Sequence, residues 1–189
     1  MLKIIFGTVI LLLIGLIIGC NYADQTTEAN LLINEAKQFS DNAGKTDGEF
    51  AGLMSRILSL DLQNTENKEL YRQNNKSKFD ELINLGEQLN KNRGETVSKL
   101  EQAAKLNVNG KFKDYLELKV KENRKLAEID KLKLTAAKEF LNEETNNDFK
   151  KAVRNYRLQN FEDSENKATD FSNKADQIVK ENPNVFQKQ

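Results

Sequence analysis

The chain contains no histidine and no tryptophan, and it has one cysteine and one proline among 189 residues. Without histidine it lacks the usual general base and the ligand on which nearly every common zinc or di-iron site depends. The glycines Gly44, Gly48 and Gly52 do not form a phosphate-binding loop, because the last of them is not followed by Lys-Ser or Lys-Thr and the segment follows an expected helix, where such a loop needs a strand. No serine stands in a nucleophile elbow. We therefore expect a protein that is not an enzyme, with no catalytic residue, no metal and no cofactor.

Proline is the second scarce residue. The one proline, Pro183, follows the last apolar repeat of the chain. Because proline interrupts helices, its near absence favours a helical chain. No segment shows the alternation of apolar and polar residues, rich in β-branched side chains, that is typical of strands. The sequence predicts an all-α fold, namely an elongated antiparallel helical bundle of three long and two to three shorter helices.

Glycines and capping side chains mark the expected helix boundaries. Gly44, Gly48 and Gly52 lie in a turn-rich connector over residues 42–52. Gly94 suits the left-handed residue that closes a helix. Residues 107–110 form a further break. Side chains that can cap a helix start stand at Thr26 or Thr27, at Asn64 or Thr65, and at Asn147 and Asp148. The expected helices cover residues 26–43, 50–60, 64–94, 97–106, 111–143 and 147–182.

Apolar residues recur every three or four positions in these segments, as in helices with one buried face. The apolar arc is widest in residues 111–143, so we expect this helix near the middle of the bundle. The apolar stripe of the last helix changes register near residues 158–163, which predicts a kink or a short break. The core is expected to contain Ala29, Leu32, Ile33, Ala36, Phe39, Ala43, Phe50, Leu53, Met54, Ile57, Leu58, Leu60, Leu70, Tyr71, Phe79, Leu82, Ile83, Leu89, Val97, Leu100, Ala103, Ala104, Leu106, Phe112, Tyr115, Leu116, Val120, Leu126, Ala127, Ile129, Leu134, Ala137, Phe140, Leu141, Phe149, Val153, Tyr156, Phe161, Ala168, Phe171, Ala175 and Ile178.

The first twenty residues have the composition of an export signal. Lys3 is followed by an apolar run from Ile4 to Ile18, and Gly19 precedes the single cysteine, Cys20. The residues Ile17-Ile18-Gly19-Cys20 resemble the bacterial lipobox. This resemblance implies a membrane lipoprotein, cleaved between Gly19 and Cys20, with lipid on the Cys20 thiol. It also implies an exported protein at the cell membrane or outer membrane, and it says nothing about the domain that follows.

An uncleaved signal anchor is the alternative for this segment. Residues 4–20 would form about 25 Å of helix at 1.5 Å per residue, at the short edge of what spans a bilayer. The polar residues directly after Cys20 favour lipidation. The expected organisation is a signal peptide over residues 1–19, a lipidated tether over 20–25, a helical bundle over 26–182 and a C-terminal tail over 183–189.

The charges are balanced, with 29 basic and 29 acidic side chains. Loss of residues 1–19 removes Lys3 alone, which leaves a formal net charge of −1. A chain without net positive charge has no long-range attraction for nucleic acid, so we expect none as a partner. With Cys20 carrying lipid, no disulfide forms within one chain.

Three groups of polar residues are candidate sites. The acidic clusters Glu143-Glu144 with Asp148, and Glu162-Asp163 with Glu165, would suit a hard cation, but solvated helix ends that favour negative charge explain them more simply. The lysines around residues 119–121 and 131–133 would suit anionic lipid, but the interleaved acidic residues favour a surface held by salt bridges. Asn123 and Asp130 interrupt an apolar stripe and would either line a ligand cavity or face solvent.

Two functional hypotheses follow from these observations. The first is a membrane-tethered, non-catalytic interaction or structural module that binds an envelope protein, a wall polymer or a second copy of itself. The second is a binding protein for a small hydrophobic or peptide ligand held between the helices. An exposed apolar groove would favour the first, and a cavity lined by Asn123 and Asp130 the second.

Overall fold

The computed structural model describes residues 24–59, 68–141 and 161–186 of the chain. These residues form helices and connecting turns, with no strand among them. The predicted all-α fold is confirmed, and three of the helices are long. The helices are α2 (Thr26–Ser59), α3 (Lys68–Ala104), α4 (Gly110–Leu141), α6 (Glu162–Glu181) and α7 (Pro183–Phe186).

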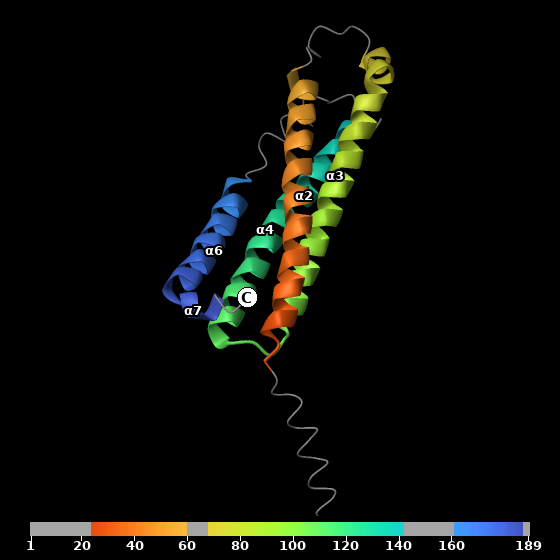
Figure 1. Ribbon diagram of the computed structural model, residues 1–189. Coiled ribbons are helices and arrows are strands. Elements are labelled where there is room, and N and C mark those ends of the chain that lie inside the picture. The colour runs from red at the N-terminus through yellow and green to blue at the C-terminus, as the bar shows by residue number, and fades with distance from the viewer. Residues whose placement is uncertain (1–23, 60–67, 142–160, 187–189) are drawn as a thin grey trace, which may run out of the picture.

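The helices lie side by side in an elongated bundle (Figure 1). Helix α3 packs along both α2 and α4, and α6 packs along α4. With 32 to 37 residues each, the three long helices extend about 50 Å at 1.5 Å per residue. Helix α4 contacts α3, α6 and α7 and forms an ion pair with α2, so the prediction that residues 111–143 lie near the middle is confirmed for the described part.

The start of α2 and the turn between α3 and α4 meet at one end of the bundle (Figure 1). The backbone N–H of Gln25 donates to the carbonyl of Asn107 at 2.9 Å, and the backbone N–H of Asn107 donates to Oε1 of Gln25 at 2.9 Å. These two hydrogen bonds hold Gln25, the residue before α2, against the turn between α3 and α4. Asp24 caps α2 by accepting from the backbone N–H of Thr26, so Asp24 takes the capping role predicted for Thr26 or Thr27.

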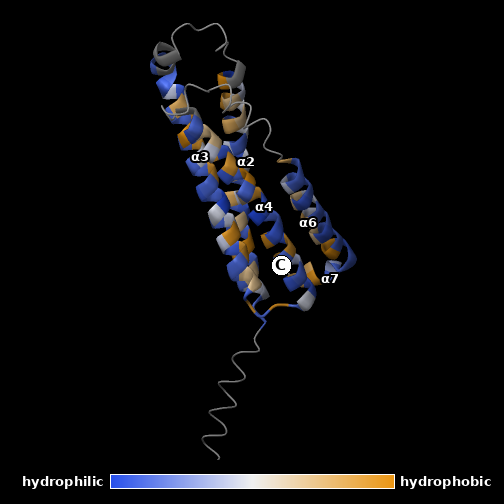
Figure 2. Ribbon diagram, turned by 180° about the vertical axis from the view of Figure 1, so that it is seen from behind, coloured by the Kyte–Doolittle hydropathy of each residue, from blue (hydrophilic) through white to orange (hydrophobic). Residues whose placement is uncertain are grey.

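Buried residues repeat at intervals of three and four along the helices. In α2 the residues at every seventh position from Ala29 to Ile57 are buried. This heptad spacing is typical of helices that wrap around each other with a left-handed twist. Figure 2 shows hydrophilic and hydrophobic residues alternating along each helix, as one buried side requires. In α3 the spacing is unbroken through Phe79, Leu82, Gly86, Leu89, Arg93, Thr96, Leu100 and Ala103.

The apolar core consists of two separate clusters. One lies toward the end where α2 finishes and is built of Phe50, Leu53, Met54, Ile57, Phe79, Leu82 and Ala137. The other lies toward the Gln25 end and is built of Ala29, Ala36, Leu100, Ala103, Phe112, Leu116 and Val120. The segment between them contains buried polar side chains.

Two predicted helix breaks are wrong. Helix α2 runs without interruption through residues 42–52, and α3 runs through Gly94. The three glycines of α2 are exposed, no atom lies within 4 Å of where their Cβ atoms would be, and none has a positive φ angle. Packing on the opposite face of each helix continues past the glycines, and this tertiary contact outweighs the roughly 1 kcal/mol that each glycine costs. The short segments 50–60 and 97–106 are therefore parts of the long helices, as far as they are described.

Other boundaries agree with the sequence. The break at residues 107–110 is confirmed, and Asn109 caps α4 by accepting from the backbone N–H of Lys111 at 2.8 Å. Helix α6 ends at Glu181, just before Asn182-Pro183, and begins at Glu162 within the predicted break. Residues 183–186 of the predicted tail form α7, whose Phe186 packs on Phe112. The predicted caps at Asn64, Thr65, Asn147 and Asp148 lie outside the described residues.

Candidate functional site

A layer of buried polar side chains crosses the middle of the bundle. Its members occupy core positions of three helices, where apolar residues would be expected. Buried polar or charged groups need partners, because each one loses its hydration on folding. The layer consists of Thr46 on α2, Arg93 and Thr96 on α3, and Asn123 and Asp130 on α4.

An ion pair between α3 and α4 is the centre of this polar layer. Nε of Arg93 donates to Oδ2 of Asp130 at 2.9 Å, and the side chains are 8% and 3% exposed. Nη1 of Arg93 lies 3.4 Å from Oδ1 of Asn123, and the amide of Asn123 donates to the backbone carbonyl of Lys119 at 2.9 Å. Arg93 therefore bridges two side chains that stand two helical turns apart on α4.

Backbone contacts extend the polar layer along the α3–α4 interface. The Asn90 side-chain amide donates to the carbonyl of Asp130 at 2.9 Å and to the carbonyl of Gly86 at 2.8 Å. Gly86 is buried because α4 approaches closely there: a Cβ atom on it would lie 3.0 Å from Cδ1 of Leu134. Helices α3 and α4 are thus held together by a hydrogen bond at Asn90 and by close packing one turn earlier, at Gly86.

The two threonines satisfy their own hydroxyl groups. Oγ1 of Thr46 donates to the carbonyl of Asn42, and Oγ1 of Thr96 donates to the carbonyl of Asn92, each at 2.9 Å. Both bonds join residues four apart in one helix, so neither threonine bonds across the interface in this way. The long Arg93 side chain makes the contacts between helices.

Burial has the largest effect on the pKa of Asp130. Loss of water raises the pKa of its carboxyl above 3.8, and the adjacent guanidinium of Arg93 opposes this shift. Lys133 lowers the same pKa further, while Asp47 on α2 raises it. Nζ of Lys133 pairs with Oδ1 of Asp47 at 2.5 Å, so a second ion pair joins α4 to α2 beside the first.

The arrangement has the properties of a structural polar layer. Arginine stays protonated and cannot act as a general base, and Oδ2 of Asp130 is engaged with it. The expected alternative in which Asn123 and Asp130 face solvent is wrong, since they are 4% and 2% exposed. Neither of the two described surface depressions is lined by them. The polar layer instead fixes how α3 lies against α4, because sliding either helix would separate Arg93 from its partners.

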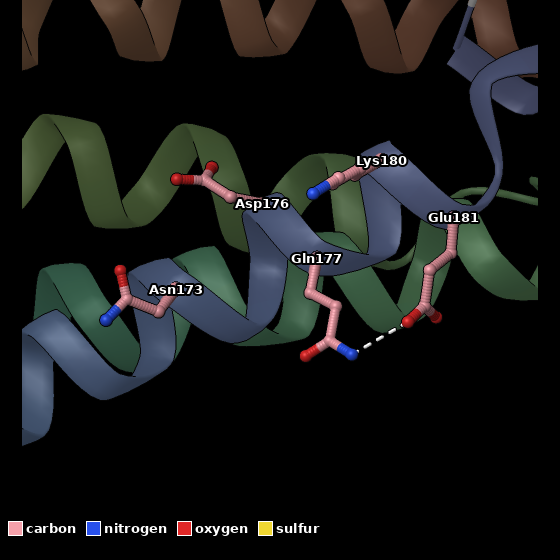
Figure 3. Close-up of a pocket in the computed structure, with 5 residues that line it drawn as sticks. All are labelled: Asn173, Asp176, Gln177, Lys180 and Glu181. Carbon is pink, nitrogen blue, oxygen red and sulfur yellow. Dashed lines mark hydrogen bonds between the residues drawn. The ribbon is translucent and has the colours of Figure 1, made fainter.

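Two open depressions lie on the described surface. One runs along α6, where Gln177 donates to Glu181 at 2.7 Å (Figure 3). The other lies between α3 and α4, where Nη2 of Arg124 donates to Oε1 of Glu101 at 2.7 Å. Both have charged side chains of each sign exposed to solvent, so neither has the enclosed apolar lining of a small-molecule site.

The other predicted sites have the following positions. Glu162, Asp163 and Glu165 lie exposed in the first turn of α6, where the helix dipole favours negative charge, and Lys167 pairs with Asp163 at 2.6 Å. The described residues hold no group of three or more side chains placed to bind a metal. Gly19, Cys20, Glu143, Glu144 and Asp148 lie outside the described residues.

The predicted network of salt bridges on the lysine-rich surface of α4 is present. Lys119 pairs with Glu122, Lys125 pairs with Glu128 at 2.6 Å, and the pair between Lys133 and Asp47 was given above. An exposed ion pair between neighbours on one helix, such as Lys125 with Glu128, is weak, about 0.3 to 0.5 kcal/mol, so it adds little stability.

The buried residues Arg93 and Thr96 and the half-buried Asn90 are not among the residues predicted for the core. The glycine after Arg93 predicts a helix end there, which would place Arg93 outside the core. The available signal was the spacing: Leu89, Arg93, Thr96 and Leu100 follow one another at intervals of four, three and four, which continues the apolar repeat through polar residues.

The chain matches no known protein family, and comparisons with curated proteins and with solved structures found no similar protein. Within the described ranges, no helix is both long enough and apolar enough to cross a bilayer.

Proposed function

We propose that this chain is a bacterial lipoprotein, tethered through lipid on Cys20 to the outer face of the cell membrane or to the outer membrane. Its helical bundle acts there as a non-catalytic interaction or structural module, with an envelope protein, a wall polymer or a second copy as partner. The observation that carries the proposal is the position of Cys20, directly after the apolar run and only five residues before Gln25.

The geometry of the bundle supports a short tether. Gln25 is held to Asn107 by two hydrogen bonds, and five residues of chain from Cys20 to Gln25 span at most about 17 Å even when fully extended. The end of the bundle that contains the α3–α4 turn would then stay close to the membrane. Because the long helices extend about 50 Å, the opposite end would be free to reach a partner away from the bilayer.

The interaction role is supported by the composition and by the surface. A chain without histidine, whose only thiol carries lipid, has few groups for catalysis. The buried ionisable pair at the centre of the bundle is engaged in holding helices. The described surface is dominated by charged and amide side chains, as in proteins that stay soluble while presenting long helical faces.

Intact mass and detergent partitioning of the native protein test the tether. We compare the wild type with Cys20→Ser and with a matched control, Asn21→Ser, which alters the neighbouring residue and keeps the thiol. The wild type and the control are expected to lack residues 1–19, to carry a diacylglyceryl group and to enter the detergent phase, whereas Cys20→Ser does none of these. Retention of the full-length chain in the membrane with either residue at position 20 would establish the uncleaved anchor instead.

Cross-linking in intact cells tests the interaction role. The wild-type chain is expected in complexes whose mass exceeds that of one chain, and these are expected to be lost in Cys20→Ser, which is not held at the membrane. A chain that remains monomeric at every cross-linker concentration, and does not sediment with purified wall polymer, would overturn the interaction role while leaving the lipid tether intact.

A further inference from the structure

Helix α6 is attached to the bundle differently from the other long segments. It packs along α4 and touches α7, and it makes no comparable contact with α2 or α3 in the described part of the chain. In Figure 1 it lies on the outer side of α4, beside the three-helix unit. Only two of its residues, Ala168 and Ala175, are fully buried. Phe171 and Ile178 of α6 are half-buried, so α6 encloses less apolar surface than α2, whose Phe50 and Ile57 are completely enclosed.

The surface of α4 beneath α6 is partly polar. Tyr115, Glu122, Ile129 and Ala136 stand seven residues apart and form one stripe along α4. Tyr115 packs against the apolar cluster at the Gln25 end, as do Val185 and Phe186 of α7, whereas the other three residues lie outside both clusters. This stripe faces α7 at Tyr115, because the centroid of the Tyr115 ring lies 5.4 Å from the centroid of the Phe186 ring on α7. Burial raises the pKa of Tyr115, and the carboxylate of Asp176 on α6 adds to this rise.

A charged group in this stripe opposes close packing. One carboxylate oxygen of Glu122 is shut off from solvent, with the ammonium of Lys119, one turn earlier on the same helix, as its ion-pair partner. Removing an ion pair from water costs free energy that offsets much of the attraction between the charges. Packing α6 over Glu122 therefore carries this cost, and moving α6 away removes it.

We propose that α6 and α7 form a displaceable arm, which opens from α4 as one unit while the α2–α3–α4 bundle stays folded, and that the uncovered stripe of α4 binds an amphipathic helix of a partner. The partner helix has small residues at seven-residue intervals, as α6 has at Ala168 and Ala175. Helix α7 moves with α6 because one residue, Asn182, separates them and because the two contact each other. This inference rests on the proposed role as an interaction module and names the surface that it uses.

Native-state hydrogen exchange on the full chain tests the opening. Amides of α6 and α7 are expected to share one opening equilibrium, at least about tenfold more populated than the global unfolding that exposes α2, α3 and α4. Two substitutions should move this equilibrium in opposite directions. Ala175→Glu places a charge in the α4–α6 contact and should open the arm, whereas Glu122→Gln removes the charge of the partly buried Glu122 and should close it. Asn173→Glu, at an exposed position of α6 (Figure 3), is the matched control and should leave exchange unchanged.

A labelled peptide with the sequence of residues 161–186 tests the binding surface. It should bind the Ala175→Glu chain more tightly than the wild type, and Ile129→Asp in the same chain should abolish binding. A peptide that carries the Ala175→Glu change should not bind. Exchange of α6 only through global unfolding would overturn the arm, and failure of the peptide to bind the opened chain would overturn the binding surface. Neither result depends on lipidation, so both are distinct from failure of the tether at Cys20.

Discussion

Nε of Arg93 on α3 lies 2.9 Å from Oδ2 of Asp130 on α4, in a layer where both side chains are almost completely removed from solvent. This pair separates the two apolar clusters of the bundle and stands at a core position of each helix. A charged pair at such a position adds little net stability, but it penalises every arrangement in which the two groups do not meet. We infer that the pair selects one alignment of α3 against α4.

The first prediction concerns the removal of one partner or of both. Asp130→Leu should lower the free energy of unfolding by about 3 to 5 kcal/mol, because it leaves the guanidinium of Arg93 buried without its partner. The double variant Arg93→Met with Asp130→Leu should recover most of this loss. Urea unfolding followed by circular dichroism measures both. Lys37→Met, which removes an exposed ion pair with Asp41, is the control and should change the free energy by about 0.5 kcal/mol or less. A double variant as unstable as the single one would contradict this account.

The second prediction is a pH dependence. Because burial raises the pKa of Asp130 above 3.8, the folded chain binds a proton there more tightly than the unfolded chain does. The stability that this proton contributes is fully present below pH 3.8 and is lost as the pH rises through the raised pKa. The free energy of unfolding of the wild type relative to Asp130→Asn should therefore increase as the pH is lowered from about 7 toward about 4. Asp41→Asn is the control for loss of an exposed carboxylate, and a difference for Asp130 that shrinks on acidification would exclude this explanation.

The third prediction tests the continuity of α2. The triple variant Gly44→Ala, Gly48→Ala and Gly52→Ala should stabilise the chain by roughly 0.5 to 1 kcal/mol for each substitution, because alanine favours helix and its Cβ meets open space at each position. Thermal unfolding should show a higher midpoint, with helix content equal to or above that of the wild type. A turn in this segment would give the opposite result, with loss of stability on substitution.

The fourth prediction uses two glycines of α3 as a matched pair. Gly94→Ala should stabilise the chain, since nothing lies within 4 Å of the added Cβ. Gly86→Ala should be less stable than Gly94→Ala by about 1 kcal/mol or more, because its Cβ would stand 3.0 Å from Cδ1 of Leu134, and Leu134 would have to move to make room. Helix α4 lies close to Gly86 and not to Gly94, so equal stabilities would mean that the α3–α4 contact at Gly86 leaves room for a methyl group.

The sequence by itself determined the helical class, the position of the turn at residues 107–110 and the end of the last helix at Asn182. These features follow from local chemistry: the scarcity of proline, the capping side chain of Asn109 and the apolar spacing within each segment. The same reasoning placed α4 at the centre, because a helix that is apolar over a wide arc must be covered on more than one side.

Only the tertiary structure decided what happens at the glycines and at the polar core positions. Gly44 and Gly94 look like helix ends when their own conformational freedom is considered, but packing on the opposite face carries each helix past them. Asp130 looks like a surface residue or a cavity residue until Arg93, 37 positions earlier, is brought beside it. A partner that far away in sequence leaves no local signal, and only the tertiary structure shows that Arg93 supplies a hydrogen-bond and ion-pair partner for the buried carboxyl group.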